Sequence, residues 1–484
     1  MKGLNRSNMV DKFLEFEKRE GLFDKQVGSV NLWGFIRAYI YMQILEKSGV
    51  SNYEKQKNVG KLKDTLKVLK NCIFHNPMII TKRKKILFIQ TYRKEKWDDG
   101  LEECIFTGEI SREFSEDSYL VVLPHRGKGG VATKGRDTIY LDYVVYFSTM
   151  YRRFLELKNK KLNNEINIYA NELKNSLNME FGIDFKEEDF ARELRYNYYV
   201  LTSMKKLFIK LFKKISPLLI VEVCGYGSVQ MAINDVAKEL GIKTIELQHG
   251  VITKNHLGYN YPEKKEYPFF PDEIFLFSEY WKKNARLPIE QSKLIVTGFP
   301  YMDRNKKKYK DMKDTHRELN ILVISQPTDV ERFSSVILCF IEKMNQLKIK
   351  YHLVYKLHPS EYYMKNETYD LIESFHEVTM VKDDQLNLYH YYALADVQVG
   401  MYSTAIYEGL AFGLSTYLLN TKLTMMHMKD LYIEGYVKLF DDGEELADLL
   451  LDSKPEEKRE EYLKVFFCEG ATERIVSEIK KRVM

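Results

Sequence analysis

The 484-residue chain has little cysteine, and none of it stands in a pattern that binds metal or builds a disulfide framework. The five cysteines are far apart and form no CxxC pair: Cys72, Cys104, Cys224, Cys339 and Cys468. Small secreted domains and zinc modules both depend on closely spaced cysteines, so neither class is expected. This usage fits a reducing compartment, and the cytosol is the expected location.

Long apolar runs and strong net charge are also missing. No run of about 18 uncharged apolar residues occurs, so we expect no membrane-spanning helix. Residues 1–20 lack the apolar core of a secretory signal. The formal net charge of +5 is too weak to indicate a nucleic acid partner, and no zinc-finger, RRM or KH signature occurs. With 45% hydrophobic and 30% charged residues, the chain reads as globular.

Short apolar segments alternate with helix-length segments, which is typical of α/β proteins with parallel sheets. We expect residues 1–80 to form a helical segment packed on a first Rossmann-like domain, 81–310, and a second such domain to span 311–484. The charged stretch 303–319 is interpreted as a solvated linker, with a basic binding patch as the alternative. The expected strands are 85–90, 119–123, 218–223, 243–248, 273–278 and 293–298, then 320–325, 351–356, 377–381, 396–400, 415–420 and 436–440.

Ligands of open α/β sheets bind at the carboxyl ends of the strands, so the residues after each strand are the candidates. In "CGYGSVQ", Gly225 and Gly227 permit a tight turn, and Ser228 can cap the next helix. A plain strand–helix turn and a contact of Tyr226 and Ser228 with an acceptor or a phosphate both stay open. After "KTIELQ" comes His249, whose ordinary pKa suits proton transfer near neutral pH. Gly250 next to it lets the chain turn.

The second half offers three more sets of residues after strands. "KLHPS" places Lys356, His358 and Pro359 where a phosphate could bind, or where a proline simply fixes a turn. "MYSTAIYEG" places Ser403 and Thr404 at a helix start, where free N–H groups favour an anion. Glu408 has the wrong spacing for a capping box and could bind ribose hydroxyls. After another strand, Gln326 could line the same site. Plain helix capping is the alternative for the serine and threonine.

Three motifs, taken in order, resemble the GT-B superfamily of bacterial capsule and lipopolysaccharide glycosyltransferases. They are Gln248-His249-Gly250, Lys356-x-His358-Pro359 and Ser403-Thr404-Ala405-x-x-Glu408-Gly409. Sialyltransferases and Kdo transferases that use cytidine-activated donors, and CDP-glycerol-type polymerases, are similar. The resemblance covers residues 218–440 and implies two Rossmann-like domains facing a central cleft.

The resemblance also implies roles for the matching residues. In the C-terminal domain, His358, Ser403 and Thr404 would hold the donor nucleotide and its phosphate, and Glu408 would hold the ribose. Lys356, Pro359 and Gln326 are added to the donor site by their places after strands and not by the resemblance. The N-terminal domain would bind the acceptor near Gly225, Tyr226 and Ser228, with His249 as the base, as in the glycerophosphotransferase branch. The fold has no DxD-type requirement, so we expect no metal and no cofactor.

We therefore predict an inverting glycosyltransferase of surface polysaccharide biosynthesis. It would transfer the sugar of a nucleotide sugar, a CMP-sugar by preference, to a glycan or lipid-linked glycan acceptor. Three alternatives stay open: a CDP-polyol phosphotransferase, a UDP-sugar 2-epimerase and a non-catalytic capsule assembly protein. The basic amphipathic segment 205–219 permits peripheral association with the inner face of the plasma membrane. For that segment a core helix with a solvated lysine face is the main interpretation, and contact with the membrane is the alternative.

Overall fold

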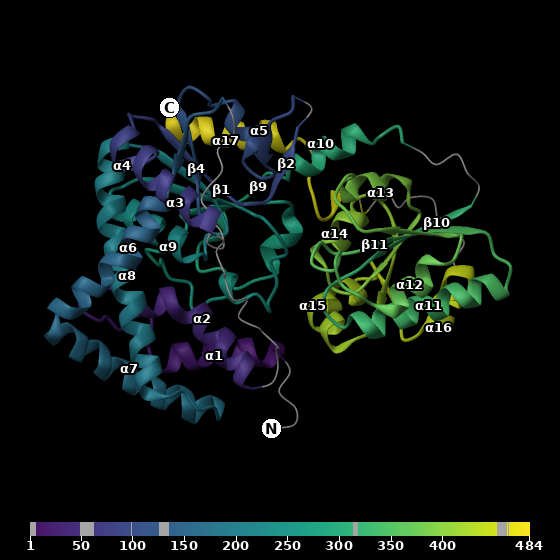
Figure 1. The fold of residues 1–484 in the computed structure, drawn as a ribbon, viewed down its shortest axis with the longest axis horizontal. Coiled ribbons are helices and arrows are strands. Elements are labelled where there is room, and N and C mark those ends of the chain that lie inside the picture. Colours follow the sequence, from purple (N-terminus) through teal and green to yellow (C-terminus); the bar gives the residue numbers. More distant parts are fainter. Residues whose placement is uncertain are drawn as a thin grey trace. The chain divides into compact units, whose positions relative to one another are not determined.

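The computed structural model describes residues 6–48, 62–97, 99–124, 135–312, 318–452, 462 and 464–484. The chain divides into two compact units (Figure 1). Unit 1 contains Met1–Leu276, Lys282–Pro300 and Thr472–Met484. Unit 2 contains Phe277–Trp281 and Tyr301–Ala471. The last helix of the chain therefore belongs to unit 1.

Unit 1 is built on a seven-stranded parallel sheet in the order β5-β4-β1-β6-β7-β8-β9. Strands β1, β4 and β6 are buried along their whole length, because parallel strands are covered on both faces. The strands are β1 (Ile86–Gln90), β4 (Ser118–Val122), β5 (Thr138–Tyr140), β6 (Leu219–Val223), β7 (Lys243–Leu247), β8 (Glu273–Leu276) and β9 (Leu294–Val296). A separate antiparallel pair joins β2 (Lys94–Lys96) to β3 (Glu102–Cys104).

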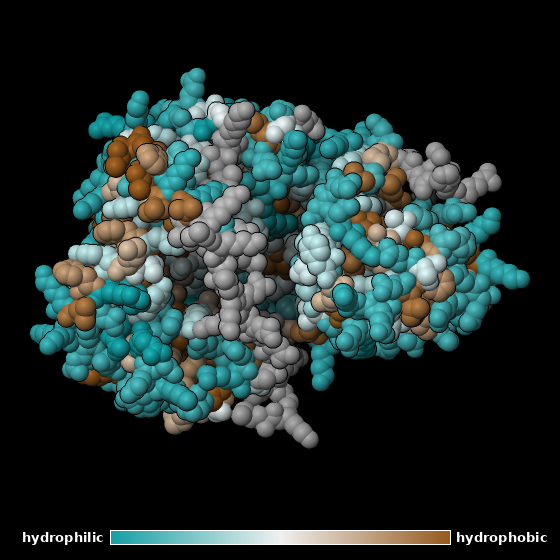
Figure 2. Space-filling view, in the orientation of Figure 1, coloured by the Kyte–Doolittle hydropathy of each residue, from teal (hydrophilic) through white to brown (hydrophobic). Residues whose placement is uncertain are grey.

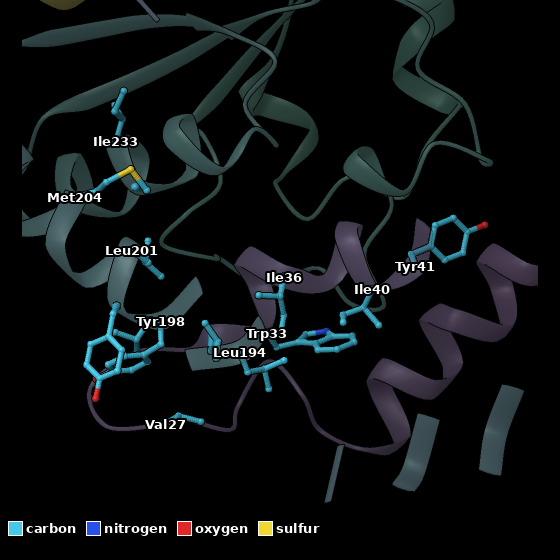
Figure 3. Close-up of a cluster of buried hydrophobic side chains, with 14 of the residues drawn as sticks. Val27, Trp33, Ile36, Ile40, Tyr41, Leu194, Tyr198, Leu201, Met204 and Ile233 are labelled. Atoms are coloured by element: carbon cyan, nitrogen blue, oxygen red, sulfur yellow. The ribbon is translucent and has the colours of Figure 1, made fainter. Parts of the chain in front are cut away.

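The helices of unit 1 include a long N-terminal pair that packs on the sheet-covering helices. Trp33, Ile36 and Ile40 of α2 share one hydrophobic cluster with Leu194 and Leu201 of α8 (Figure 3). The helices are α1 (Arg6–Arg19), α2 (Leu32–Lys47), α3 (Leu62–Phe74), α4 (Pro77–Ile80), α5 (Gly108–Arg112), α6 (Asp142–Lys158), α7 (Lys160–Phe181), α8 (Glu187–Ile215), α9 (Ser228–Glu239) and α17 (Ala471–Val483).

Unit 2 has a six-stranded parallel sheet in the order β12-β11-β10-β13-β14-β15. Its strands are β10 (Leu319–Ile324), β11 (Tyr351–Lys356), β12 (Val378–Val381), β13 (Val397–Gly400), β14 (Ser415–Leu419) and β15 (Lys438–Phe440). Its helices are α10 (Pro300–Lys308), α11 (Val330–Gln346), α12 (Glu367–Glu373), α13 (Leu388–Leu394), α14 (Thr404–Leu410), α15 (Lys422–Ile433) and α16 (Gly443–Asp452).

The α/β fold class, with two Rossmann-like domains as the GT-B fold requires, is confirmed by these two parallel sheets. Each expected strand has a counterpart in the structure. The linker interpretation of 303–319 is wrong at both ends, because α10 runs to Lys308 and β10 begins at Leu319. None of the helices within the described ranges is long and apolar enough to cross a membrane.

Residues 205–215 of this segment form the end of α8, and four of their apolar side chains belong to the core. Phe208, Leu211, Phe212 and Ile215 are buried. The apolar face of this helix is therefore used inside the protein, and only its lysines face solvent. The main interpretation, a core helix with a solvated lysine face, is confirmed for the apolar side chains.

Candidate functional site

His249 follows strand β7 and lies in a polar cluster at the carboxyl end of the unit 1 sheet. Its Nε2 is 3.1 Å from the hydroxyl oxygen of Tyr226, and its Nδ1 is 3.1 Å from the hydroxyl oxygen of Tyr259. The Tyr259 hydroxyl donates a hydrogen bond of 2.7 Å to Oε1 of Glu246. The imidazole side chain is 19% exposed. Two hydroxyl groups and one buried carboxylate thus fix the ring while leaving part of it accessible.

Glu246 lies beside a second buried carboxyl group, that of Glu222. The two residues are register partners on β7 and β6, and both side chains are almost fully buried. Asn234 donates a hydrogen bond of 2.7 Å to Oε1 of Glu222. A Cβ atom on Gly225 would lie 2.6 Å from Oε2 of Glu246 and 2.8 Å from Oε1 of Glu222. Glycine is required at this position because the two carboxyl groups fill the space over its backbone.

The electrostatics of the cluster favour a positively charged His249. Burial lowers the pKa of His249, but hydrogen bonds and charges from Cys224 and Glu246 outweigh it and raise the pKa to about 9. Burial and the nearby charge of Glu246 raise the pKa of Glu222 well above its ordinary value. Glu246, whose Oε1 lies 3.6 Å from Nδ1 of His249, is the carboxyl group placed to act as the counter-ion of the imidazolium.

The N-terminal helices hold the loop that carries Tyr259. Arg37 of α2 forms a bidentate ion pair with Glu17 of α1: its Nε donates to Oε1 at 2.6 Å and its Nη2 donates to Oε2 at 2.8 Å. It also donates to the carbonyl oxygens of Leu257 and Asn260 at 3.0 and 2.9 Å. The side chains of Arg37 and Glu17 are 3% and 0% exposed. This buried ion pair ties the first two helices to the chain on both sides of Tyr259.

The other predicted site residues of unit 1, which follow β6 and β7, are only partly placed in this cluster. Tyr226 lies in the His249 cluster, but Ser228 does not cap α9, because Gly227 is the N-cap residue and no side chain caps it. The chain bends at Gly250 as expected, but glycine is not required there, because its φ is not positive and a Cβ atom would meet nothing within 4 Å. The strain lies at Cys224 instead, which has φ of 66° directly after β6.

In unit 2, Gln326 and the segment before Ser403 come together. Oε1 of Gln326 accepts a hydrogen bond of 2.8 Å from the backbone N–H of Tyr402. Ser403 is the N-cap of α14, and its Oγ accepts from the N–H of Ala405 at 3.2 Å. Thr404 begins that helix, and Glu408 lies half-buried one turn further along. The helix start after β13 is therefore where the sequence motif predicts it.

The carboxylate of Glu361 fixes the backbone of the Lys356–His358 segment by hydrogen bonding. The buried carboxylate of Glu361 accepts from the His358 backbone N–H at 2.9 Å and from the Ser325 hydroxyl at 3.0 Å. His358 and Pro359 are exposed residues. The inner part of the His358 imidazole loses some of its contact with water, and this partial burial lowers its pKa.

The ammonium group of Lys356 is almost buried, and burial lowers its pKa. It donates to the Tyr362 hydroxyl and, at 2.7 Å, to the carbonyl oxygen of Asp383, with the carboxylate of Asp384 at 3.4 Å. Three protein oxygens therefore surround it, and Lys356 organises the loop beside His358.

Sequence reasoning missed several members of these clusters: Glu222, Cys224, Glu246, Tyr259, Glu361 and Arg37. Two of them left a signal, because Glu222 and Glu246 are charged residues within the otherwise apolar strands LIVEV and KTIEL. Within the described residues, no group of histidine, cysteine, aspartate and glutamate side chains is arranged to hold a metal ion.

Comparison with known proteins gives structural neighbours only. No protein-family model matches the chain, and no curated protein matches its sequence. A UDP-GlcNAc 2-epimerase from Methanocaldococcus jannaschii is 13% identical, with 82% of this chain and 99% of that chain covered and a TM-score of 0.47. MurG from Acinetobacter baumannii is 11% identical over 82% and 99% of the two chains, also with a TM-score of 0.47.

A trehalose 6-phosphate synthase from Burkholderia multivorans is 10% identical over 83% of this chain and 96% of that chain, with a TM-score of 0.43. At these identities and TM-scores the likeness assigns no activity to this chain. The function has to be argued from the clusters around His249 and His358.

Proposed function

We propose that the protein is an inverting glycosyltransferase that transfers a sugar from a nucleotide-activated donor, a CMP-sugar by preference, to a hydroxyl group of a glycan acceptor. The observation that carries the proposal is the His249 cluster: a partly accessible imidazole, fixed by two tyrosine hydroxyls and a buried carboxylate, at the carboxyl end of a parallel sheet. Ligand sites of such sheets lie at this end. A positioned imidazole is the group most often used to move a proton there.

In this mechanism unit 1 binds the acceptor and unit 2 binds the donor. The acceptor oxygen forms the bond to the anomeric carbon as the bond from that carbon to the phosphate oxygen breaks. The phosphate leaves with the electron pair, and His249 takes the proton of the acceptor hydroxyl. Glu246 then stabilises the imidazolium, directly and through the Tyr259 hydroxyl. Tyr226 keeps its hydroxyl proton, since burial raises its pKa; it holds Nε2 until the acceptor hydroxyl replaces it, and Nε2 is the nitrogen that takes the proton.

The donor side of the proposal rests on Gln326, His358, Ser403, Thr404 and Glu408. The N–H groups at the start of α14 and the His358 imidazole would bind the leaving phosphate as its charge develops. Glu408 would accept hydrogen bonds from the ribose. Lys356 supports the loop beside His358, because protein oxygens surround its ammonium group.

The raised pKa of His249 favours a second candidate, a CDP-polyol phosphotransferase. A pKa of about 9 leaves only about 1% of the imidazole unprotonated at pH 7. An imidazolium can bind a phosphoryl group that is being transferred. In this case the product carries the donor phosphorus in a phosphodiester, so phosphorus analysis of the product distinguishes the two reactions.

The first test is thermal unfolding with CMP, CDP, UDP and GDP, for the wild type and His358→Ala. A nucleotide at about 100 times its Kd adds about 2.7 kcal/mol to stability, which raises the Tm of a unit of this size by about 5–10 °C. We expect CMP or CDP to give this shift and His358→Ala to lose it. The matched control is His376→Ala, since His376 is an exposed histidine of the same unit.

Other results would redirect the proposal. A shift with UDP alone removes the cytidine preference. Conversion of a UDP-sugar to its C2 epimer without any acceptor would replace the transferase by the epimerase predicted as an alternative. No shift with any nucleotide contradicts both transferase proposals and favours the non-catalytic assembly protein.

A further inference from the structure

Exposed large hydrophobic side chains are concentrated on adjoining helices of unit 1. Six of them on α3 and α4 are 42–70% exposed and form what we call the apolar face: Leu66, Leu69, Ile73, Phe74, Ile79 and Ile80. Figure 2 shows hydrophobic atoms gathered at the upper left, where Figure 1 places these two helices. Contiguous apolar surface of this kind marks an interaction site, because single exposed hydrophobic residues are normally scattered.

Helix α6 extends the apolar face with exposed aromatic rings. Phe147, Tyr151 and Phe154 stack in sequence, with ring centroids 5.3 and 5.6 Å apart, and Phe154 is 54% exposed. The helices α3 and α6 are joined at a buried hydrogen bond of 3.3 Å from Asn71 to Asp142. The apolar face is thus anchored to the core of unit 1.

Basic residues border the apolar face. Lys214 of α8 donates to the carbonyl oxygens of Met78 and Ile79 at 3.0 and 2.8 Å, so the exposed lysines of α8 lie beside α4. Among the residues that the structure describes, five exposed basic side chains on α3, on α8 and after α4 have no ion pair: Lys70, Lys82, Arg83, Lys210 and Lys213.

The neighbouring lysines show that ion pairing is available here. Lys84 pairs with Asp137 at 2.8 Å and Lys85 with Asp117 at 3.6 Å. Lys82 and Arg83, the basic residues closest to α4 in the chain, therefore lie near the exposed isoleucines with no ion-pair partner among the residues that the structure describes. An apolar surface with a border of uncompensated positive charge complements an anionic lipid surface, which offers acyl chains and negative headgroups together.

We propose that the apolar face docks unit 1 on an anionic membrane surface, with the aliphatic and aromatic side chains in the interface and the basic border on the headgroups. A second copy of the chain fits less well, because a symmetric pair through this face would bring the two basic borders together. If the acceptor of the proposed function is a lipid-linked glycan, docking would bring unit 1 to it, and this part rests on the proposed function. The docking itself rests on the surface alone.

The test is co-sedimentation of the full chain with vesicles of equimolar phosphatidylcholine and phosphatidylglycerol, and with vesicles of phosphatidylcholine alone. We expect the wild type to bind the anionic vesicles and to be released by salt. The variant Ile73→Ser/Phe74→Ser/Ile79→Ser should bind at least about tenfold more weakly. Because these side chains are already exposed, the variant should keep the wild-type Tm.

Two further variants make the test specific. Lys82→Gln/Arg83→Gln/Lys213→Gln should weaken binding by about fivefold for each charge removed. The matched control on unit 2 is Leu371→Ser/Tyr432→Ser/Ile433→Ser, which replaces equally exposed hydrophobic residues and should bind as the wild type does.

Equal binding by the serine variant and the wild type, equal binding to neutral and anionic vesicles, or no binding at all would overturn the proposal. A dimer in sedimentation velocity that the serine variant dissociates would assign the face to a second copy instead. The nucleotide-induced Tm shift of the serine variant, measured without vesicles, reports on the proposed function separately.

Discussion

Replacing Glu246 by glutamine should lower the pKa of His249 while leaving the ring in place. Glu246 lies 3.6 Å from Nδ1 of His249 and is bonded to the Tyr259 hydroxyl that contacts the same nitrogen. Glutamine keeps the shape of the side chain and an oxygen acceptor for that hydroxyl, but it removes the negative charge. Burial lowers the pKa of His249. In the variant, the charge of Glu246 no longer works against this effect, so the pKa falls.

The size of the effect follows from the shift itself. The pKa of His249 is raised from 6.5 to about 9, and such a shift corresponds to about 3 kcal/mol between the two protonation states. Cys224 contributes to the shift as well as Glu246, so we expect the glutamine variant to lose about 1–2 pKa units.

The sign of the pH dependence is fixed by the direction of the shift. Because the folded-state pKa is above the unfolded value, the contribution of His249 to stability is fully present below pH 6.5 and is lost as the pH rises through about 9. We therefore expect the free energy of unfolding of the wild type to fall between these two pH values. Glu246→Gln should show a smaller fall, confined to lower pH.

The assay is an NMR titration of the imidazole carbons in histidine-labelled protein, with the His249 signal assigned by its absence in His249→Gln. The control is Glu239→Gln, which replaces an exposed glutamate at the end of α9 in the same unit and should leave the titration unchanged. A wild-type His249 that titrates near its ordinary value, or an unchanged pKa in Glu246→Gln, would refute the role assigned to the buried carboxylate.

Three further outcomes are expected. If His249 is the base, kcat/KM should rise with pH up to an inflection near 9; a fall above that pH would favour the imidazolium of the phosphotransferase. Arg37→Met should lower the free energy of unfolding in denaturant by about 3–5 kcal/mol, because Glu17 stays buried without its partner; a loss below about 1 kcal/mol would contradict this. Gly225→Ala should cost about 1–3 kcal/mol by overpacking against the two carboxyl groups, and a wild-type melting curve would show that they move aside.

The sequence was sufficient for the sheets because their strands are short apolar runs with polar ends. β6 and β11 both begin within one residue of their expected positions. The sequence was misleading at α10, whose lysine-rich residues show no apolar periodicity although they form a helix. β5, a strand of three residues that is followed at once by α6, was not predicted.

The candidate site was predictable only where it follows strands. His249 and Tyr226 were found in this way, and the structure brings their side chains together. Tyr259 and Arg37 could not be found, because they reach the cluster from a loop and from a helix 220 residues before Leu257 in the chain. Contacts over such separations depend on tertiary packing, which no local pattern encodes.

The buried carboxyl pair also bears on the choice between the two proposed reactions. Burial and the charge of Glu246 raise the pKa of Glu222 well above its ordinary value, and Glu246 lies 3.6 Å from Nδ1 of His249, so a carboxylate beside the ring offsets the charge of its imidazolium. Such a cluster attracts a transferring phosphoryl group weakly, because the carboxylate cancels the field of the imidazolium beyond their immediate surroundings. An acceptor hydroxyl needs no net positive charge and only requires a partner that can exchange a proton. The counter-charge of Glu246 therefore weakens the argument for phosphoryl binding that the raised pKa of His249 makes, and the pH dependence of kcat/KM decides between the two reactions.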